Sequence, residues 1–111
     1  MRVLVVEDEA LIAMEIAVIL EEAGAEIIGP ANSVEQAHQL IAQQASDPHA
    51  ALLDVNVAGV SSDSIARLLL ARKVPFAFMT GYTSAEVSEL VPAAPVLQKP
   101  FTPAQLLAVL Q

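Results

Sequence analysis

Carboxylate, hydroxyl and amine side chains stand at the ends of several short apolar runs in this sequence. Asp54 ends the apolar run of residues 50–53, and Glu7-Asp8, Thr80 and Lys99-Pro100 follow three other runs. A strand buried on both faces places such an acid at the carboxyl edge of its sheet, where open α/β folds bind ligands. Taken alone, Asp54 could simply turn the chain. Together, these groups predict a shared polar site.

The charges of this predicted site favour a divalent cation. Glu7, Asp8 and Asp54 contribute three negative charges and Lys99 one positive charge, which leaves a formal charge of −2. Uncompensated like charges raise one another's pKa and destabilise a fold. Carboxylate oxygens without nearby His or Cys favour Mg²⁺ over Zn²⁺. We expect Asp8 and Asp54 to bind Mg²⁺ directly and Glu7 to bind it through a water.

The same groups are suited to accepting a phosphoryl group, with Asp54 as the nucleophile. Phosphoryl transfer needs mainly alignment and neutralisation of the charge on the equatorial oxygens. Mg²⁺ can hold one of these oxygens and the Lys99 amine a second. The Thr80 hydroxyl, with the backbone N–H that follows Asp54, can hold the third.

Alternating strands and helices would bring these residues together. Apolar runs predict five strands, and N-terminal capping patterns followed by helical spacing predict five helices between and after them. This alternation is typical of an α/β protein, a doubly wound parallel sheet with helices on both faces. Residues 57–60 are expected to be a loop. The predicted strands cover residues 3–6, 25–29, 50–54, 75–79 and 96–98, and the helices end near Glu22 or begin near Ser33, Ser61, Thr83 and Thr102.

Length and composition predict a single compact domain over residues 1–111. The chain is 55% hydrophobic and has no cysteine, so disulfides and thiolate metal sites are excluded. A net charge of −8 argues against direct binding to nucleic acid or an anionic membrane, because no basic patch could neutralise phosphates. The first apolar run is too short for the core of a signal peptide. A cytoplasmic protein is expected.

The ordered positions of Glu7-Asp8, Asp54, Thr80 and Lys99-Pro100 resemble those of two-component response regulator receiver domains along essentially the whole chain. The resemblance implies a flavodoxin-like (βα)5 fold with strand order 2-1-3-4-5. It implies that Asp54 accepts a phosphoryl group from a sensor histidine kinase or a histidine phosphotransfer protein, that the Asn56 backbone carbonyl completes the Mg²⁺ site, and that the Lys99-Pro100 peptide is cis. Such a domain switches partner-protein binding and is a phosphoacceptor rather than an enzyme, with slow autodephosphorylation.

One position departs from the family pattern. The family usually has Tyr or Phe three residues before its lysine, and this chain has Val96 there. Tyr82 is the available substitute for an aromatic switch, although it could equally be a loop aromatic. The segment Phe78-Met79-Thr80-Gly81-Tyr82 resembles the Phe-x-Thr-Gly-Tyr signature of a receiver subgroup that often stands alone.

Two other functional classes fit the sequence less well. A phosphatase of the haloacid dehalogenase type would need an acid where Asn56 stands and room for a cap. A flavodoxin-like cofactor protein would need a phosphate-binding loop where Glu7-Asp8 would repel a phosphate. On the first helix, Leu11, Met14 and Val18 widen the apolar stripe, which indicates either a broadly buried helix or a surface that meets a partner.

Overall fold

The computed structural model describes residues 1–81 and 94–110. Its centre is a five-stranded sheet in which every neighbouring pair of strands is parallel. The sheet strands are β1 (Arg2–Val6), β2 (Glu26–Ala31), β3 (Ala50–Asp54), β6 (Phe76–Thr80) and β7 (Val96–Gln98). The described helices are α1 (Ala10–Glu22), α2 (Val34–Gln43), α3 (Asp63–Ala71) and α4 (Pro103–Val109).

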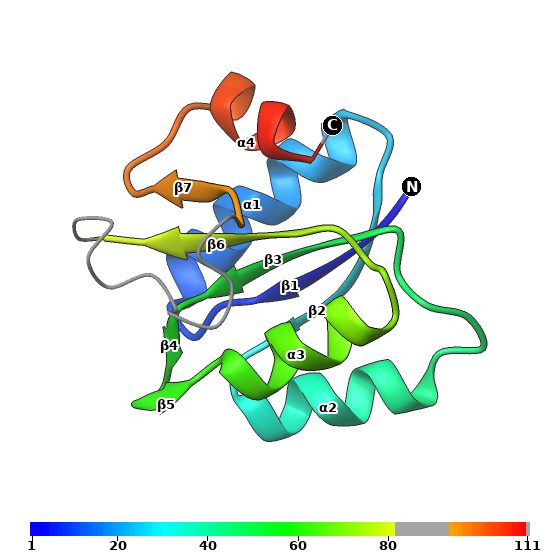
Figure 1. Ribbon diagram of the computed structural model, residues 1–111. Coiled ribbons are helices and arrows are strands. Elements are labelled where there is room, and N and C mark those ends of the chain that lie inside the picture. The colour runs from blue at the N-terminus through cyan, green and yellow to red at the C-terminus, as the bar shows by residue number, and fades with distance from the viewer. Residues whose placement is uncertain (82–93, 111) are drawn as a thin grey trace.

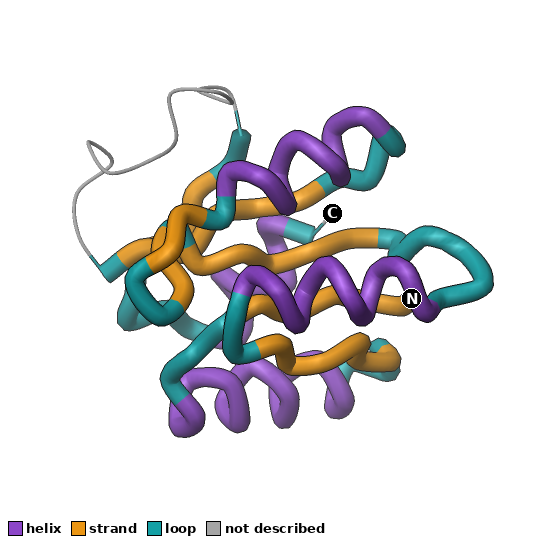
Figure 2. The backbone as a smooth tube through the Cα atoms, turned by 90° about the horizontal axis from the view of Figure 1, so that it is seen from below, coloured by secondary structure: helices purple, strands orange, loops and turns teal. Residues whose placement is uncertain are grey.

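The strand order β2-β1-β3-β6-β7 confirms the predicted doubly wound α/β fold. It corresponds to the expected order 2-1-3-4-5, because β4 and β5 lie outside this sheet in a small hairpin of their own. Figure 2 shows the strands running side by side. As a result, β1, β3, β6 and β7 are consecutive neighbours, and their carboxyl ends lie along one edge of the sheet (Figure 1).

Helices cover both faces of the sheet and enclose two hydrophobic cores. In Figure 1, α1 and α4 lie on one face and α2 and α3 on the other. Alternate residues of β3 point to opposite faces, so Leu52 packs in the core beneath α1 while Leu53 packs in the core beneath α3. All five residues of β3 are buried. The strand that ends in Asp54 is therefore fixed on both sides.

The predicted helix starts are confirmed at α2 and α4. The Ser33 hydroxyl accepts a hydrogen bond from the Gln36 N–H, and Thr102 and Gln105 form a complete capping box. The helix predicted to begin near Thr83 falls within residues 82–93, outside the described residues. Among the described helices, none combines the length and the apolarity that a membrane crossing requires.

Two local expectations were wrong. Residues 57–60, expected to be a loop, belong to a hairpin of β4 (Asn56–Val57) and β5 (Val60–Ser61). The second strand, expected to end at Gly29 before Pro30, continues to Ala31. Gly29 has a φ of +101°, and the register of β1 and β2 shifts next to it, so the strand kinks around the proline and resumes pairing.

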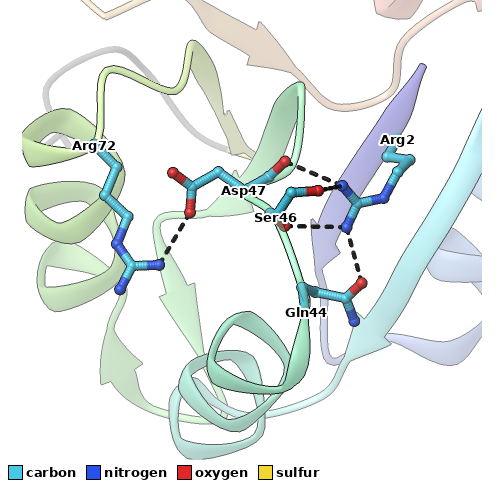
Figure 3. A network of polar contacts seen from close by, with 5 residues as sticks. All are labelled: Arg2, Gln44, Ser46, Asp47 and Arg72. Carbon is cyan, nitrogen blue, oxygen red and sulfur yellow. Dashed lines mark hydrogen bonds and ion pairs between the residues drawn. The ribbon is translucent and has the colours of Figure 1, made fainter.

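The amino edge of the sheet is held by a polar network centred on Arg2 (Figure 3). The Arg2 guanidinium donates to the side chains of Gln44 and Ser46 and to the backbone carbonyls of Ser46 and Asp47, over 2.8–3.2 Å. The Asp47 carboxylate also accepts a hydrogen bond from Arg72 at 3.0 Å. This network ties the loop after α2 to β1 and α3, at the edge opposite Asp54.

Candidate functional site

The polar residues singled out in the sequence meet at the carboxyl edge of the sheet. Asp54 ends β3, Thr80 ends β6, Lys99 follows β7, and Glu7 and Asp8 follow β1. A cleft of about 400 Å³ opens between them, and we call it the acidic cleft. Its lining residues are Asp8, Glu9, Asp54, Val55, Asn56, Thr80, Gly81 and Lys99.

Lys99 connects two buried carboxylates. Its Nζ lies 2.6 Å from Glu7 Oε1 and 3.2 Å from Asp54 Oδ2. Glu7 is 2% exposed and Asp54 is 9% exposed, so both ion pairs are largely shielded from water. The second Glu7 oxygen, Oε2, accepts a hydrogen bond from the Glu9 N–H at 3.1 Å. Lys99 therefore contacts two acids, where the sequence led us to expect it to offset one.

The burial of Asp54 and the charges around it raise its pKa and so disfavour its ionised form. Burial raises the pKa of Asp54 from its ordinary value of 3.8 to about 7, and repulsion by the Glu7 carboxylate adds to the rise while Lys99 opposes it. Burial alone lowers the pKa of Lys99, but contact with Glu7 and the negative charge of Asp54 raise it overall above its ordinary value. Lys99 is therefore positively charged at neutral pH, and a further cation near Asp54 would favour the carboxylate.

Three carboxylates converge closely enough to share a cation. Glu7, Asp8 and Asp54 each offer an oxygen, and these oxygens lie within 4.8 Å of one another. The donors are all hard oxygens, which fits Mg²⁺. Among the described residues, the Lys99 ammonium is the group that pairs with these acids, and it neutralises a single charge of the three. The residues present therefore fit a divalent cation in both charge and donor type.

The pairing within the β4–β5 hairpin leaves the Asn56 carbonyl oxygen outside the ladder of hairpin hydrogen bonds. Val57 pairs with Val60 next to the two-residue turn, and Asn56 pairs with Ser61. Hydrogen-bonded pairs alternate along an antiparallel ladder, and the Ser62 N–H donates to the Val55 carbonyl at 3.0 Å. By this alternation, Asn56 and Ser61 form a pair without hydrogen bonds between them. The Asn56 carbonyl is thus outside the hairpin ladder, and Asn56 is one of the residues that line the acidic cleft.

Thr80 and Lys99 are linked through the backbone at the other side of the acidic cleft. Thr80 is buried, and its carbonyl accepts a hydrogen bond from the Lys99 N–H at 2.8 Å. The peptide between Lys99 and Pro100 is cis. Val96, at the position usually aromatic in the resembling family, is half-buried and pairs with Phe78. Tyr82 lies outside the described residues.

One buried residue at the site was not singled out in the sequence. Ser62 is fully buried, and its hydroxyl donates to the Val55 carbonyl at 3.2 Å, beside the N–H bond to the same oxygen. The sequence assigned Ser62 only to a capping region before α3, yet its side chain makes no cap hydrogen bond there. A serine in a run of polar residues gives no signal for this contact, because the contact depends on the hairpin.

Comparison with known proteins identifies the same architecture elsewhere. The chain is 35% identical over 112 residues to the phyllosphere-induced regulator PhyR of Methylorubrum extorquens, which covers 98% of this chain and 42% of that protein. The solution structure of SdrG from Sphingomonas melonis Fr1 superposes with a TM-score of 0.85 at 38% identity, covering 98% of this chain and 94% of SdrG. PhyR from Brucella abortus superposes with a TM-score of 0.81 at 30% identity, covering 97% of this chain and 45% of PhyR.

The extent of these matches fixes the family. The chain spans about half the length of the curated relatives it matches, with coverages of 42%, 55% and 49%. The shared region is the part that a family model describes as the response regulator receiver domain, and this model matches residues 3–111. The chain therefore belongs to the receiver domains of response regulators, which act in two-component signalling.

Proposed function

We propose that this chain accepts a phosphoryl group on Asp54 from a phosphohistidine donor, with Mg²⁺, and that phosphorylation changes which partner protein it binds. The observation that supports this most strongly is the position of Asp54. Its carboxylate lies in an open cleft, 3.2 Å from Lys99 and within 4.8 Å of oxygens from two other acids. We further propose that residues 1–111 form one such domain, in the cytoplasm.

The transfer is a displacement at phosphorus. An Asp54 oxygen forms a bond to phosphorus as the bond from phosphorus to the donor's imidazole nitrogen breaks, and that nitrogen keeps the electron pair. The product is an acyl phosphate on Asp54 and a free histidine on the donor. Bound Mg²⁺ supplies positive charge that favours ionised Asp54 and offsets the phosphoryl oxygens. Glu7, Asp8, Asp54 and the Asn56 carbonyl would hold it, with Glu7 acting through a water.

Lys99 and Thr80 are suited to stabilising the transferred group. The Lys99 ammonium already lies at hydrogen-bond distance from Asp54, so it can donate to a phosphoryl oxygen attached there. The Thr80 hydroxyl and the backbone N–H that follows Asp54 can donate to another. The domain takes part in its own phosphorylation and slow hydrolysis but does not turn over as an enzyme does.

Switching would follow from the same contacts. A phosphoryl group on Asp54 gives Thr80 a new hydrogen-bond partner, and the conformer that suits this contact becomes more populated. With Val96 at the usual aromatic position, Tyr82 is our candidate for the second switch residue. The downstream partner would be a protein, because the net charge of −8 disfavours nucleic acid.

The donor protein, a sensor histidine kinase or a histidine phosphotransfer protein, would dock on α1. Leu11, Met14 and Val18 form an exposed apolar stripe on this helix, with exposures of 82%, 65% and 53%. Charged residues of α1 are exclusively acidic, which favours a partner with basic groups around an apolar patch. The stripe begins two residues after Glu9, which lines the acidic cleft at the start of α1. A donor on this face can therefore present its histidine to Asp54.

Labelling with a small phosphodonor tests the assignment. We expect Asp54→Asn to abolish Mg²⁺-dependent incorporation of phosphate from acetyl phosphate, measured by intact-protein mass spectrometry. Asp47→Asn is the matched control, since this exposed aspartate lies at the opposite edge of the sheet and pairs with Arg72. Undiminished labelling of the Asp54→Asn protein would refute the assignment.

A further inference from the structure

The β4–β5 hairpin has a turn that requires an unusual backbone conformation. Its two turn residues, Ala58 and Gly59, have φ values of +51° and +82°. Positive φ at both central residues is typical of the tight two-residue turn that matches the twist of a hairpin. Glycine adopts this conformation readily, whereas alanine does so at a cost of about 1 kcal/mol or more. The hairpin therefore keeps a strained residue at its tip.

The hairpin is anchored at its base and at its tip. At the base, Ser62 donates two hydrogen bonds to the Val55 carbonyl, and Val57 is fully buried in the core beneath α3. At the tip, the N–H of Ala58 donates to Asp8 Oδ2 at 3.1 Å. Residues 50 positions apart in the sequence are thus joined directly. The strained residue is the one that makes this contact.

This contact bears on cation binding because Asp8 is exposed, so a hydrogen bond can decide where its carboxylate points. A hydrogen bond to one carboxylate oxygen restricts the rotation of the side chain and occupies only one of the two oxygens. An oxygen of Asp8 lies within 4.8 Å of oxygens from Glu7 and Asp54. Donors that orient metal-ligating side chains typically change metal affinity by about 10-fold to 100-fold when they are removed.

We propose that the turn of the β4–β5 hairpin is a positioning element of the cation site, in which the Ala58 N–H holds Asp8 in its ligating orientation. The proposal rests on the function proposed above, since it concerns how this chain presents Asp8 to Mg²⁺. It predicts that cation affinity depends on the backbone of Ala58 and Gly59, neither of which contributes a side-chain ligand.

A pair of matched glycine substitutions tests the proposal. Gly59 has φ +82° in the hairpin turn, and Gly24 has φ +85° in the connection between α1 and β2, remote from the acidic cleft. A Cβ added at either glycine meets no atom within 4 Å, so both alanine variants introduce the same backbone strain without a steric clash. We would measure Mg²⁺ binding to the unphosphorylated full chain by NMR titration and by isothermal calorimetry.

We expect Gly59→Ala to weaken Mg²⁺ binding by about fivefold or more, the factor that corresponds to the αL penalty of a non-glycine residue. Gly24→Ala should bind Mg²⁺ within about twofold of the unmodified chain, although its stability falls similarly. Equal Mg²⁺ affinity of Gly59→Ala and the unmodified chain would overturn the hairpin proposal and leave the proposed function intact. No saturable Mg²⁺ binding by the unmodified chain would instead overturn the proposed cation site itself.

A milder variant covers the case in which Gly59→Ala fails to fold. Asparagine tolerates positive φ better than alanine does, so Gly59→Asn should retain the fold, as judged by circular dichroism. Its Mg²⁺ affinity should fall by about twofold to threefold, which is less than the fall expected for Gly59→Ala. An affinity equal to that of the unmodified chain would again contradict the proposal.

Discussion

At the scale of single residues, Lys99 determines the electrostatic balance of the acidic cleft. It contacts Glu7 and Asp54 at 2.6 Å and 3.2 Å, yet one positive charge cannot offset both acids and Asp8 as well. The raised pKa of Asp54 is the consequence of burial and of this deficit. Removing the negative charge of Asp54 and removing the positive charge of Lys99 should therefore change the stability in opposite directions.

Asp54→Asn should stabilise the protein when no divalent cation is present. The pKa of Asp54 is raised to about 7 in the folded protein. Protonated Asp54 therefore contributes fully to the free energy of unfolding below about pH 4, and this contribution is lost as pH rises through 7. Removing the charge should thus raise the free energy of unfolding at pH 8 by about 1 to 3 kcal/mol. Urea unfolding in EDTA at pH 4 and pH 8 measures this, and a variant less stable than the unmodified chain at pH 8 would contradict it.

Lys99→Met should destabilise the cation-free protein and strengthen Mg²⁺ binding. The substitution leaves the Glu7 side chain buried without its ion pair, which typically costs about 3 kcal/mol or more. It also makes the acidic cleft more negative, so Mg²⁺ should bind at least roughly threefold more tightly. The Lys99→Met protein should still be phosphorylated, but at a lower rate than the unmodified chain. Its phosphorylation should not produce the normal structural response.

The matched control for this substitution is Lys73→Met, which removes the same charge from an exposed position. It should change neither the free energy of unfolding nor the Mg²⁺ affinity appreciably. Unfolding in urea and calorimetric titration with Mg²⁺ provide both measurements. Weaker Mg²⁺ binding by Lys99→Met would show that Lys99 does not compete with the cation for Glu7 and Asp54.

At the scale of elements, the outer face of α1 should distinguish protein donors from small donors. Met14→Lys places a like charge on the apolar stripe that we assign to the donor, whose docking surface we expect to be basic. Transfer from the cognate phosphohistidine protein should therefore slow by about tenfold, because an interface anchor is lost and a repulsion is added.

Labelling by acetyl phosphate provides the internal control for the α1 variant, because a small donor does not need a docking surface. Its rate should be unchanged in Met14→Lys, as should the melting temperature, since Met14 is 65% exposed. Both rates can be measured by stopping the phosphotransfer reaction from each donor at successive times and determining the phosphorylated fraction. Equal slowing with both donors would place the effect in the acidic cleft and remove the support for docking on α1.

The elements that were predictable from sequence are those with strong local patterns. Continuous apolar runs predicted the five sheet strands, and capping residues such as Ser33 and Thr102 predicted helix starts. The hairpin was missed because its strands have two residues each and its turn has Ala58 where asparagine is typical. Its stability comes from Val57 in the core and from Ser62 on the Val55 carbonyl, contacts that no local pattern encodes.

The candidate site was predictable in its membership but not in its geometry. Parallel strands bring their carboxyl ends to one edge, so the sequence was sufficient to place Asp54, Thr80 and Lys99 near one another. The sharing of Lys99 between two acids and the bond from Ala58 to Asp8 depend on side-chain positions set by packing. The proposed role of Tyr82 stays a prediction.

At the scale of the whole molecule, the two edges of the sheet have distinct tasks. The Arg2 network and the Asp47–Arg72 ion pair fix the amino edge, while the carboxyl edge gathers three acids around the single charge of Lys99. Stabilising contacts are thus concentrated at the amino edge. The strained hairpin and the mutually repelling carboxylates lie at the carboxyl edge, beside the acidic cleft. Such a separation is common where a rigid scaffold supports residues that must change state.

The outer strands of the sheet also limit how copies of this chain can associate. β2 is interrupted by Pro30, which lacks an N–H. β7 has only three residues, with Pro95 directly before it and Pro100 two residues after it. Exposed strand edges with long rows of unpaired amides recruit further strands and lead to fibrils. Short or proline-broken borders offer few such amides. The two border strands of the central sheet therefore offer little template for strand-by-strand association between copies of this chain.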